Sequence, residues 1–214
     1  AQPTISVSDV TVTEGAGLGG GEFMDAFVSS GEGGVNIPRS LTFGPDGNLY
    51  VGSRAGVFRY DGQTGEPLST PLNHGAEFIL DNDGGGLLYV LIGQSSLPDQ
   101  VLRFDAVTGE FVDIFVGDDP LTGGVDETGG LTGAQDMVFG PDGDLYVVND
   151  TRNDSTAGVL GYDGDSGAFL GRFAAIPGPR IPNGLAFSAD GSLLFVTNRA
   201  GSSVMQIDAT TGEL

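Results

Sequence analysis

Four turn-and-strand segments decide the fold: FGPDGNLYVGS (43–53), LDNDGGGLLYVLI (80–92), FGPDGDLYVVN (139–149) and FSADGSLLFVTN (187–198). Each places an Asp-Gly turn before a strand in which apolar and polar side chains alternate. Glycine accepts the positive φ that a tight hairpin turn requires. A second segment follows each of the first: VFRYDGQTGE (57–66), VLRFDAVTGE (101–110), VLGYDGDSGA (159–168) and VMQIDATTGE (204–213). One supersecondary unit therefore occurs four times.

Two further strands complete the unit. An inner strand precedes each Asp-Gly turn, as in 182–187, and an outer strand follows the Asp-x-x-Thr/Ser-Gly turn, as in 110–116. Propeller blades have four strands and about this length. The sequence therefore predicts an all-β propeller of four four-stranded blades. The expected units span residues 35–75, 76–130, 131–180 and 181–214, within a propeller domain at 21–214.

The fourth unit reaches Leu214 at the point where its outer strand should begin. GEFMDAFV (21–28) matches the outer-strand segment GEFVDIFV (109–116) almost position for position. The match predicts a closure strand carrying Phe23, Phe27 and Val28, which would complete the last blade and remove both edges of the ring. Closure can occur within one chain or between chains.

Residues 1–20 have no place in any blade. Their strand-like segment would turn Ile5, Val7, Val10 and Val12 to one face, given a bulge near residues 8–9, and a glycine-rich tether follows at 15–21. A lone apolar strand is not stable in water. Two alternatives stay open: this segment lies on the same propeller or is disordered, or it adds to a neighbouring subunit's sheet and builds a head-to-tail oligomer or filament.

The composition restricts the partners. The chain carries 8 Lys plus Arg, all of them Arg, against 29 Asp plus Glu, and its formal charge is −21. A surface so negative repels phosphate backbones and anionic headgroups, so we expect neither nucleic acid binding nor membrane insertion. The chain opens with Ala1-Gln2-Pro3, as a chain would after a signal peptidase had cut at a small residue, so we expect a secreted or cell-surface protein. The partner that we expect is a second copy of the chain.

Acidic loops are the candidate cation sites. Carboxylates group at Asp118 and Asp119 with Asp126 and Glu127, and again at Asp81 and Asp83. Such groups of oxygen ligands resemble calcium loops, although turn chemistry alone also explains Asp-Gly. Structural Ca²⁺ and turn chemistry without an ion stay open as alternatives, with residues 118–127 as the best candidate loop.

Glycans are a second class of candidate partner. Asn149-Asp-Thr and Asn153-Asp-Ser are glycosylation sequons within one polar loop. Polar loops also produce such triplets by chance. On a secreted chain their clustering favours modification at both asparagines, although most sequons stay unmodified in a bacterial host.

IPNGLAFSADGSLLFVTNRAGSSV (181–204) resembles NHL-repeat propellers and the SMP-30/gluconolactonase-like family, and ISVSDVTVTEG (5–15) resembles the first strand of Calx-β modules. In the lactonase family a divalent metal sits in the central channel, held by acidic and Asn side chains. The resemblance carries Asn183 over to that ligand set, whereas the aligned positions of the other units hold Arg39, Ala76 and Gln135.

Hard cations need several oxygen ligands, carboxylates among them, so the sequence favours a non-enzymatic structural or interaction propeller. Two alternatives remain. One is a metal-dependent lactonase or related hydrolase. The other is a carbohydrate- or protein-binding module that makes contact through loops 93–99 and 149–157.

Overall fold

A computed structural model describes residues 26–53, 55–68, 78–81, 86–93, 99–118, 127–150, 157–178 and 181–214. Over these residues the protein is all-β, apart from one 3₁₀ turn, η1 (Glu32–Gly34). The strands in chain order are β1 (Pro38–Phe43), β2 (Leu49–Ser53), β3 (Gly56–Tyr60), β4 (Phe78–Asp81), β5 (Leu87–Ile92), β6 (Gln100–Asp105), β7 (Phe111–Val116), β8 (Ala134–Phe139), β9 (Leu145–Asn149), β10 (Gly158–Tyr162), β11 (Phe169–Ala175), β12 (Pro182–Phe187), β13 (Leu193–Asn198) and β14 (Ser203–Asp208). The described residues contain no apolar helix of membrane-spanning length.

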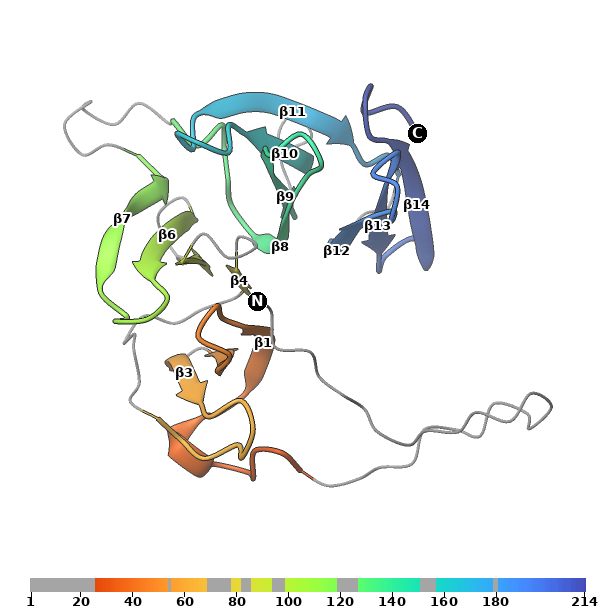
Figure 1. The fold of residues 1–214 in the computed structure, drawn as a ribbon. Coiled ribbons are helices and arrows are strands. Elements are labelled where there is room, and N and C mark those ends of the chain that lie inside the picture. Colours follow the sequence, from red (N-terminus) through yellow and green to blue (C-terminus); the bar gives the residue numbers. More distant parts are fainter. Residues whose placement is uncertain are drawn as a thin grey trace.

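The strands form four antiparallel sheets, which we number as blades 1 to 4 in chain order. Blade 1 is β1-β2-β3, blade 2 is β4-β5-β6-β7, blade 3 is β8-β9-β10-β11 and blade 4 is β12-β13-β14. The inner strands β1, β4, β8 and β12 contact one another in that order, so the blades fan out around a common centre (Figure 1). This arrangement is a β-propeller, as the repeat predicted.

Blades 2 and 3 have all four predicted strands. Blade 1 has three named strands, and its third is followed by a single bridge between Tyr60 and Pro67. Blade 4 also has three among the described residues, with β14 at its edge.

The hairpin turn after the third strand of each blade repeats one hydrogen-bonding pattern. In blade 2, the Asp105 carboxylate accepts the backbone N–H groups of Val107 and Thr108 at 2.9 and 2.7 Å. Thr108 and Val107 thereby hold the pKa of Asp105 below its usual value. Asp61, Asp163 and Asp208 also accept backbone N–H groups in their own turns. The Asp-x-x-Thr/Ser-Gly signature is thus a turn motif, as expected.

Apolar side chains pack between successive blades. Between blades 2 and 3, for example, Tyr89 and Leu91 join Leu145 and Val147 in one buried cluster. The aromatic residue of each second strand faces the next blade: Tyr89 meets Phe139 edge to face with 5.0 Å between ring centroids, and Tyr146 meets Phe187 at 5.3 Å.

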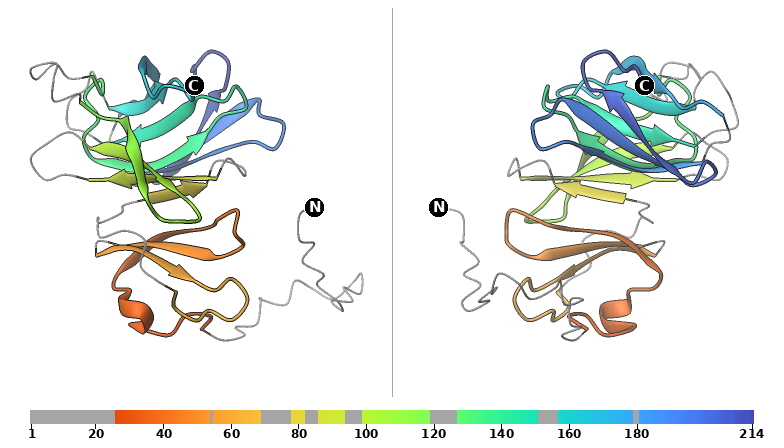
Figure 2. Two further views of the ribbon diagram at one scale, coloured as in Figure 1. Left: turned by 60° about the vertical axis from the view of Figure 1, so that its left-hand side comes forward. Right: turned by 90° about the vertical axis from the view of Figure 1, so that its right-hand side faces the viewer.

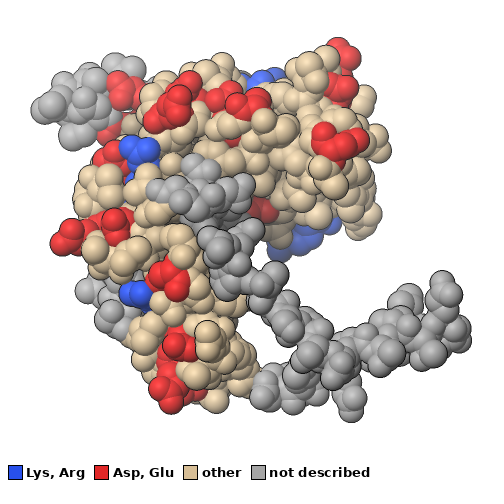
Figure 3. Space-filling model, in the orientation of Figure 1, with Lys and Arg blue, Asp and Glu red and all other residues tan. Residues whose placement is uncertain are grey.

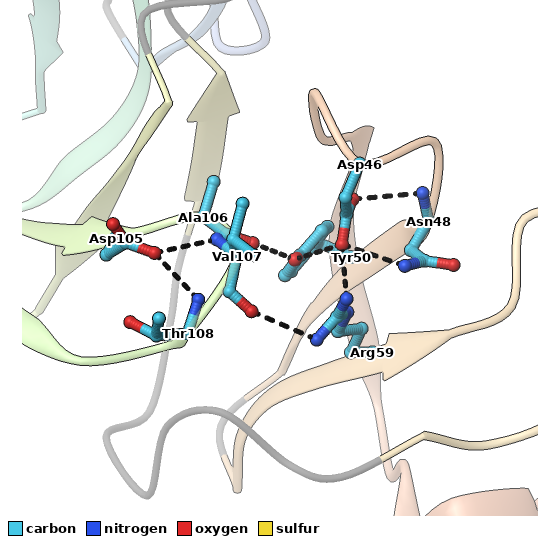
Figure 4. A network of polar contacts seen from close by, with 8 residues as sticks. All are labelled: Asp46, Asn48, Tyr50, Arg59, Asp105, Ala106, Val107 and Thr108. Atoms are coloured by element: carbon cyan, nitrogen blue, oxygen red, sulfur yellow. Dashed lines mark hydrogen bonds and ion pairs between the residues drawn. The ribbon is translucent and has the colours of Figure 1, made fainter.

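Blades 1 and 2 are also joined by polar contacts (Figure 4). Tyr50 donates from its hydroxyl to the carbonyl oxygen of Ala106 and to Asp46, and Arg59 binds both Asp46 and the carbonyl oxygen of Val107. Burial opposes ionisation of Asp46, but the hydrogen bonds from Asn48 and Tyr50 and the charge of Arg59 hold its pKa below the usual value. The charged pair therefore anchors blade 1 to the turn of blade 2.

The chain forms an open arc. Blades 1 and 4 stand at its two ends in Figure 1 and remain apart in both views of Figure 2. Within the described part of the chain, no strand of blade 1 pairs with a strand of blade 4. The faces that the end blades turn away from the arc therefore have no blade packed on them.

The two described residues of the expected closure strand do not complete blade 4 of the same chain. Phe27 and Val28 lie on blade 1, where Val28 packs with Val35 against the cluster that contains Val51 and Phe58. They do not pair with β14 of the same chain, because the short connection into β1 keeps them beside blade 1 while blade 4 lies at the far end of the arc. Phe23, the predicted assembly residues Ile5, Val7, Val10 and Val12, and the tether lie outside the described residues.

Acidic side chains are spread over all the blades visible in Figure 3, and few basic side chains accompany them. On the face that Figure 3 shows, the predicted negative charge is thus distributed over the blades. It is not gathered in one loop.

The glycine that ends the Asp163 turn gives a stability prediction. Gly167 has φ +74°, and a Cβ there would lie 1.8 Å from the carbonyl oxygen of Phe115 on the preceding blade. Gly167→Ala should lower the free energy of unfolding by about 3 kcal/mol, because the new Cβ would force the backbone of Gly167 and Phe115 apart at the interface between blades 2 and 3. The matched control, Gly143→Ala, has φ +90° with open space around it and should cost only the left-handed strain, about 1–2 kcal/mol. If urea denaturation showed that both variants lose the same free energy of unfolding, this account would be contradicted.

Candidate functional site

The inner strands carry an irregularity at the same place in three blades. The pairing register shifts between Pro38 and Ser40 in blade 1, between Ala134 and Asp136 in blade 3, and between Pro182 and Leu185 in blade 4. Bulges of this kind redirect side chains and are common beside binding sites. They fall at Arg39, Gln135 and Asn183, the positions that the lactonase resemblance singled out, whereas Ala76 lies outside the described residues.

Among the described residues, Asp136 is the carboxylate at this level of the propeller. One of its oxygens accepts the N–H of Met137 at 2.9 Å, and the other accepts the N–H of Leu185 on β12, also at 2.9 Å. Gly184 lies close by, since a Cβ on it would be 3.4 Å from the Asp136 carboxylate and 3.4 Å from the Thr197 hydroxyl. The carboxylate therefore links the inner strands of blades 3 and 4.

Burial raises the pKa of Asp136 to about 6, against the smaller opposing effect of the hydrogen bonds from Leu185 and Met137. A carboxyl group with a pKa near 6 can accept or donate a proton close to neutral pH. Asn183, exposed and next to Gly184 in sequence, adds a neutral amide to the same strand. The described residues contain no group of three His, Cys, Asp or Glu side chains placed to hold a metal ion.

The insert at residues 118–127 is closed at its base. Asp118 accepts the backbone N–H of Glu127 at 3.0 Å, which brings two of the four predicted calcium ligands together. Both residues border a groove of about 870 Å³ whose other lining includes Phe111, Ile114 and Phe169. Asp119, Asp126 and Asp83 lie outside the described residues, and for Asp81 only the backbone, at the end of β4, is described. Calcium binding at these loops stays a prediction.

The structure corrects the expected glycosylation of Asn149. Its side chain is fully buried, its amide oxygen accepts the N–H of Thr132 at 2.9 Å, and its amide nitrogen donates to the carbonyl oxygen of Gly130 at 3.0 Å. A glycan at this nitrogen has no room in the folded state. Asn198 at the same position of blade 4 accepts the N–H of Ile181 at 3.1 Å, so this asparagine is a repeated structural residue. Asn153 lies outside the described residues.

Sequence reasoning missed Asp136. The alignment of the units compared Gln135 with Asn183 and passed over the next residue, whose equivalents are Ser40, Glu77 and Gly184. The bulge at this position and the hydrogen bond from Leu185 single Asp136 out, and both depend on packing between blades. The shared YVVN and FVTN endings, in contrast, could have identified the structural role of Asn149. Loops 93–99 and 149–157, the expected contact loops of a binding module, lie mostly outside the described residues.

No protein-family model matches this chain, and no curated protein sequence does. Solved structures match its fold. The chain is similar to Kuenenia stuttgartiensis hydrazine synthase (TM-score 0.61, 17% identity, 80% of this chain and 53% of that chain). It is similar to the Neurospora crassa Pan2 WD40 domain (TM-score 0.58, 14% identity, 83% of this chain and 48% of that chain).

A further similarity is to the extracellular domain of a proposed hybrid two component system from B. thetaiotaomicron (TM-score 0.60, 16% identity, 82% of this chain and 23% of that chain). The chain spans about half the length of the first two structures. At these identities the comparisons show the propeller fold alone.

The buried carboxyl of Asp136 predicts a pH dependence of stability. The folded-state pKa of Asp136, about 6, lies above its ordinary value of 3.8, so the native state binds one more proton than the unfolded chain between these two pH values. The free energy of unfolding should therefore fall as the pH rises through this window. Asp136 should contribute up to about 2 kcal/mol of this fall, and Asp136→Asn should abolish that contribution. Urea denaturation at the two ends of the window measures it. Asp165→Asn, at an exposed carboxyl, is the control, and the prediction fails if both variants change the pH dependence alike.

Proposed function

We propose that this protein is a non-enzymatic, extracellular structural propeller that assembles with copies of itself through the two end blades of its arc. One observation carries the proposal: Val204 on blade 4 and Leu41 on blade 1 are exposed, whereas their equivalents Val159 and Met137 are buried at internal blade interfaces. The similarity to a protein described as an extracellular domain supports the location. Residues 5–12, which resemble a Calx-β strand, would be an additional attachment.

The exposed face of blade 4 is the face that points forward along the chain. Val57, Val101 and Val159 occupy one equivalent position in blades 1, 2 and 3, and each is 0% exposed because the next blade covers it. Val204 occupies that position in blade 4 and is 64% exposed. Phe195 takes the place of the second-strand aromatics Tyr89 and Tyr146. Blade 4 thus has the side chains of a blade that precedes another.

The backward face of blade 1 is exposed only in part, because Val28 and Val35 pack against the buried residues of its cluster, which are Leu49, Val51, Phe58 and Tyr60. Met137 on β8 is 1% exposed, whereas Leu41 at the equivalent position of β1 is 67% exposed. Phe43, equivalent to Phe139 and Phe187, is 53% exposed. In the internal interfaces these phenylalanines receive the aromatic residue of the preceding blade.

The two end faces are therefore the two halves of one further blade interface. Packing blade 4 of one copy onto blade 1 of the next would bury Val204 and Leu41 as Val159 and Met137 are buried, and hydrophobic burial of this kind drives association. The contact is head to tail, so it builds a ring where the rotation closes and a filament where it does not.

A charge placed on the forward face tests the proposal. Val204→Asp should reduce the assembly to monomers, because a carboxylate would lose its hydration in the interface. Val112→Asp is the matched control: it adds the same charge at a half-exposed valine on β7, away from the end faces, and should leave the assembly unchanged. Light scattering at physiological ionic strength measures the mass. A monomeric unmodified protein, or equal effects of both variants, would sink the proposal.

A second candidate function rests on Asp136. Its raised pKa and its position at the level of Asn183 are compatible with acid-base chemistry in a hydrolase of the SMP-30-like type, and hydrolysis of a lactone is the reaction that the resemblance implies. The purified protein, screened with lactones in the presence of divalent cations, should then show turnover that Asp136→Asn and Asn183→Ala both abolish. Turnover that survives both variants, or none at all, would reject this candidate.

A further inference from the structure

The Asp-Gly turn of blade 3 has the same acceptor as the turn of blade 1. Asp142 and Tyr146 are equivalent to Asp46 and Tyr50 in the repeated segments FGPDGDLYV and FGPDGNLYV. The Tyr146 hydroxyl donates to the Asp142 carboxylate at 2.7 Å, as the Tyr50 hydroxyl donates to Asp46 at 3.0 Å. The two blades therefore present a carboxylate and a tyrosine in the same arrangement.

In blade 1 this arrangement binds a guanidinium group (Figure 4). Arg59 lies opposite Tyr50 in the strand ladder, and its guanidinium forms an ion pair with Asp46. The guanidinium carbon is 5.7 Å from the centroid of the Tyr50 ring. The same group donates to the carbonyl oxygen of Val107 in the turn of the next blade, at 3.3 Å. One guanidinium thus uses a carboxylate, a ring and a carbonyl oxygen together.

Blade 3 has no side chain in the place of Arg59. Gly161 lies opposite Tyr146, and Gly171 on the outer strand lies opposite Gly161. A Cβ on Gly161 would have no contact closer than 3.8 Å, and a Cβ on Gly171 would have none within 4 Å. Two facing glycines therefore leave room beside Tyr146 where blade 1 has its arginine.

The charge in blade 3 is also not balanced locally. In blade 1 the Asn48 amide donates to Asp46 at 2.8 Å, whereas the equivalent of Asn48 in blade 3 is a second carboxylate, Asp144. Among the residues that the structure describes, neither Asp142 nor Asp144 forms an ion pair. Burial and these two carboxylates raise the pKa of Tyr146 well above its usual value. The turn of blade 3 thus carries two negative charges where the turn of blade 1, with its arginine, carries none.

Aromatic rings complete the surroundings of Gly161. In blade 2 the third-strand residue is Arg103, whose guanidinium carbon lies 4.7 Å from the centroid of the Phe115 ring. Phe173 is the equivalent of Phe115 in blade 3 and meets Tyr146 edge to face, with 4.9 Å between centroids. A guanidinium is attracted to the faces of such rings. Both ring positions that accept an arginine in blades 1 and 2 are therefore present in blade 3.

We infer that the turn of blade 3 binds an arginine side chain of another polypeptide, in the place that Arg59 fills within blade 1. Asp142 is exposed, so a guanidinium can reach it from solvent. Thr210 in the turn of blade 4 is the equivalent of Val107 and would offer its carbonyl oxygen. A planar guanidinium has enough donors for a carboxylate and a carbonyl at once, whereas an ammonium group acts as a point charge. The site lies inside the arc and is independent of the proposed assembly.

Binding of a blocked arginine tests the inference. N-acetyl-arginine N-methylamide is titrated into the full-length protein at constant ionic strength, and the backbone amide signals are followed by NMR. The signals of Gly161 and Gly171 should shift and saturate. Asp142→Asn should raise the Kd about tenfold or more, because a charged acceptor is lost. The matched control is Asp190→Asn, which makes the same charge change in the equivalent turn of blade 4 and should leave the Kd unchanged.

A second variant fills the site from within the chain. Gly161 has no positive φ, so a side chain is compatible with its backbone. Gly161→Arg should reproduce the contacts of Arg59, abolish binding of the blocked arginine and raise the Tm. Gly161→Ala adds only a methyl group at ordinary contact distance and should still bind. Should Gly161→Arg fail to fold, the comparison of Asp142→Asn with Asp190→Asn decides the inference.

Two further ligands separate the remaining explanations. Blocked lysine should bind several times more weakly than blocked arginine, and equal affinities would overturn recognition of the guanidinium, since charge alone would then explain binding. Free L-arginine should also bind more weakly, because the two carboxylates repel its own carboxylate, and tighter binding of free arginine would overturn a polypeptide as the partner. The inference is likewise overturned if no signal saturates, if both Asp→Asn variants weaken binding alike, or if binding survives in folded Gly161→Arg.

Discussion

Packing between neighbouring blades is the constraint on which the rest of this structure depends. Each sheet has apolar side chains on both faces, and a single small sheet cannot bury both of them. The second-strand aromatic of one blade therefore meets the inner-strand phenylalanine of the next, as Tyr89 meets Phe139 and Tyr146 meets Phe187. Turn glycines such as Gly167 permit the backbones to approach closely enough for this contact.

The same packing positions the candidate sites. Asp136 has an unusual environment because its carboxylate accepts the Leu185 N–H of the following blade in a partly desolvated place. Arg59 and Tyr50 reach the turn of blade 2 only because the two sheets lie face to face. At the ends of the arc the packing is incomplete, and this leaves Val204 and Leu41 exposed where their internal equivalents are buried. The proposed assembly thus follows from the rule that builds the propeller itself.

Stability of a repeat architecture is a sum of blade terms and interface terms, so an unpaired interface at each end is a cost that association would relieve. The net charge of −21 acts in the other direction, because copies of the chain repel one another over a distance set by ionic strength. Assembly of this protein would therefore depend on whether burial of the apolar end faces stabilises the contact more than repulsion between the negative surfaces destabilises it. Salt or divalent cations would shift that balance toward association.

The sequence by itself determined the fold, the four-fold repeat and the turn chemistry, since Asp-Gly turns, alternating strands and the Asp-x-x-Thr/Ser-Gly motif act through local backbone geometry. It also predicts outer-strand material at residues 21–28, of which the structure describes only 26–28. Only the tertiary structure decided where Phe27 lies, why Asn149 is buried and which carboxylate has the raised pKa. Those properties arise from contacts between blades that are distant in the chain, and neither spacing nor composition encodes how far an arc of blades closes.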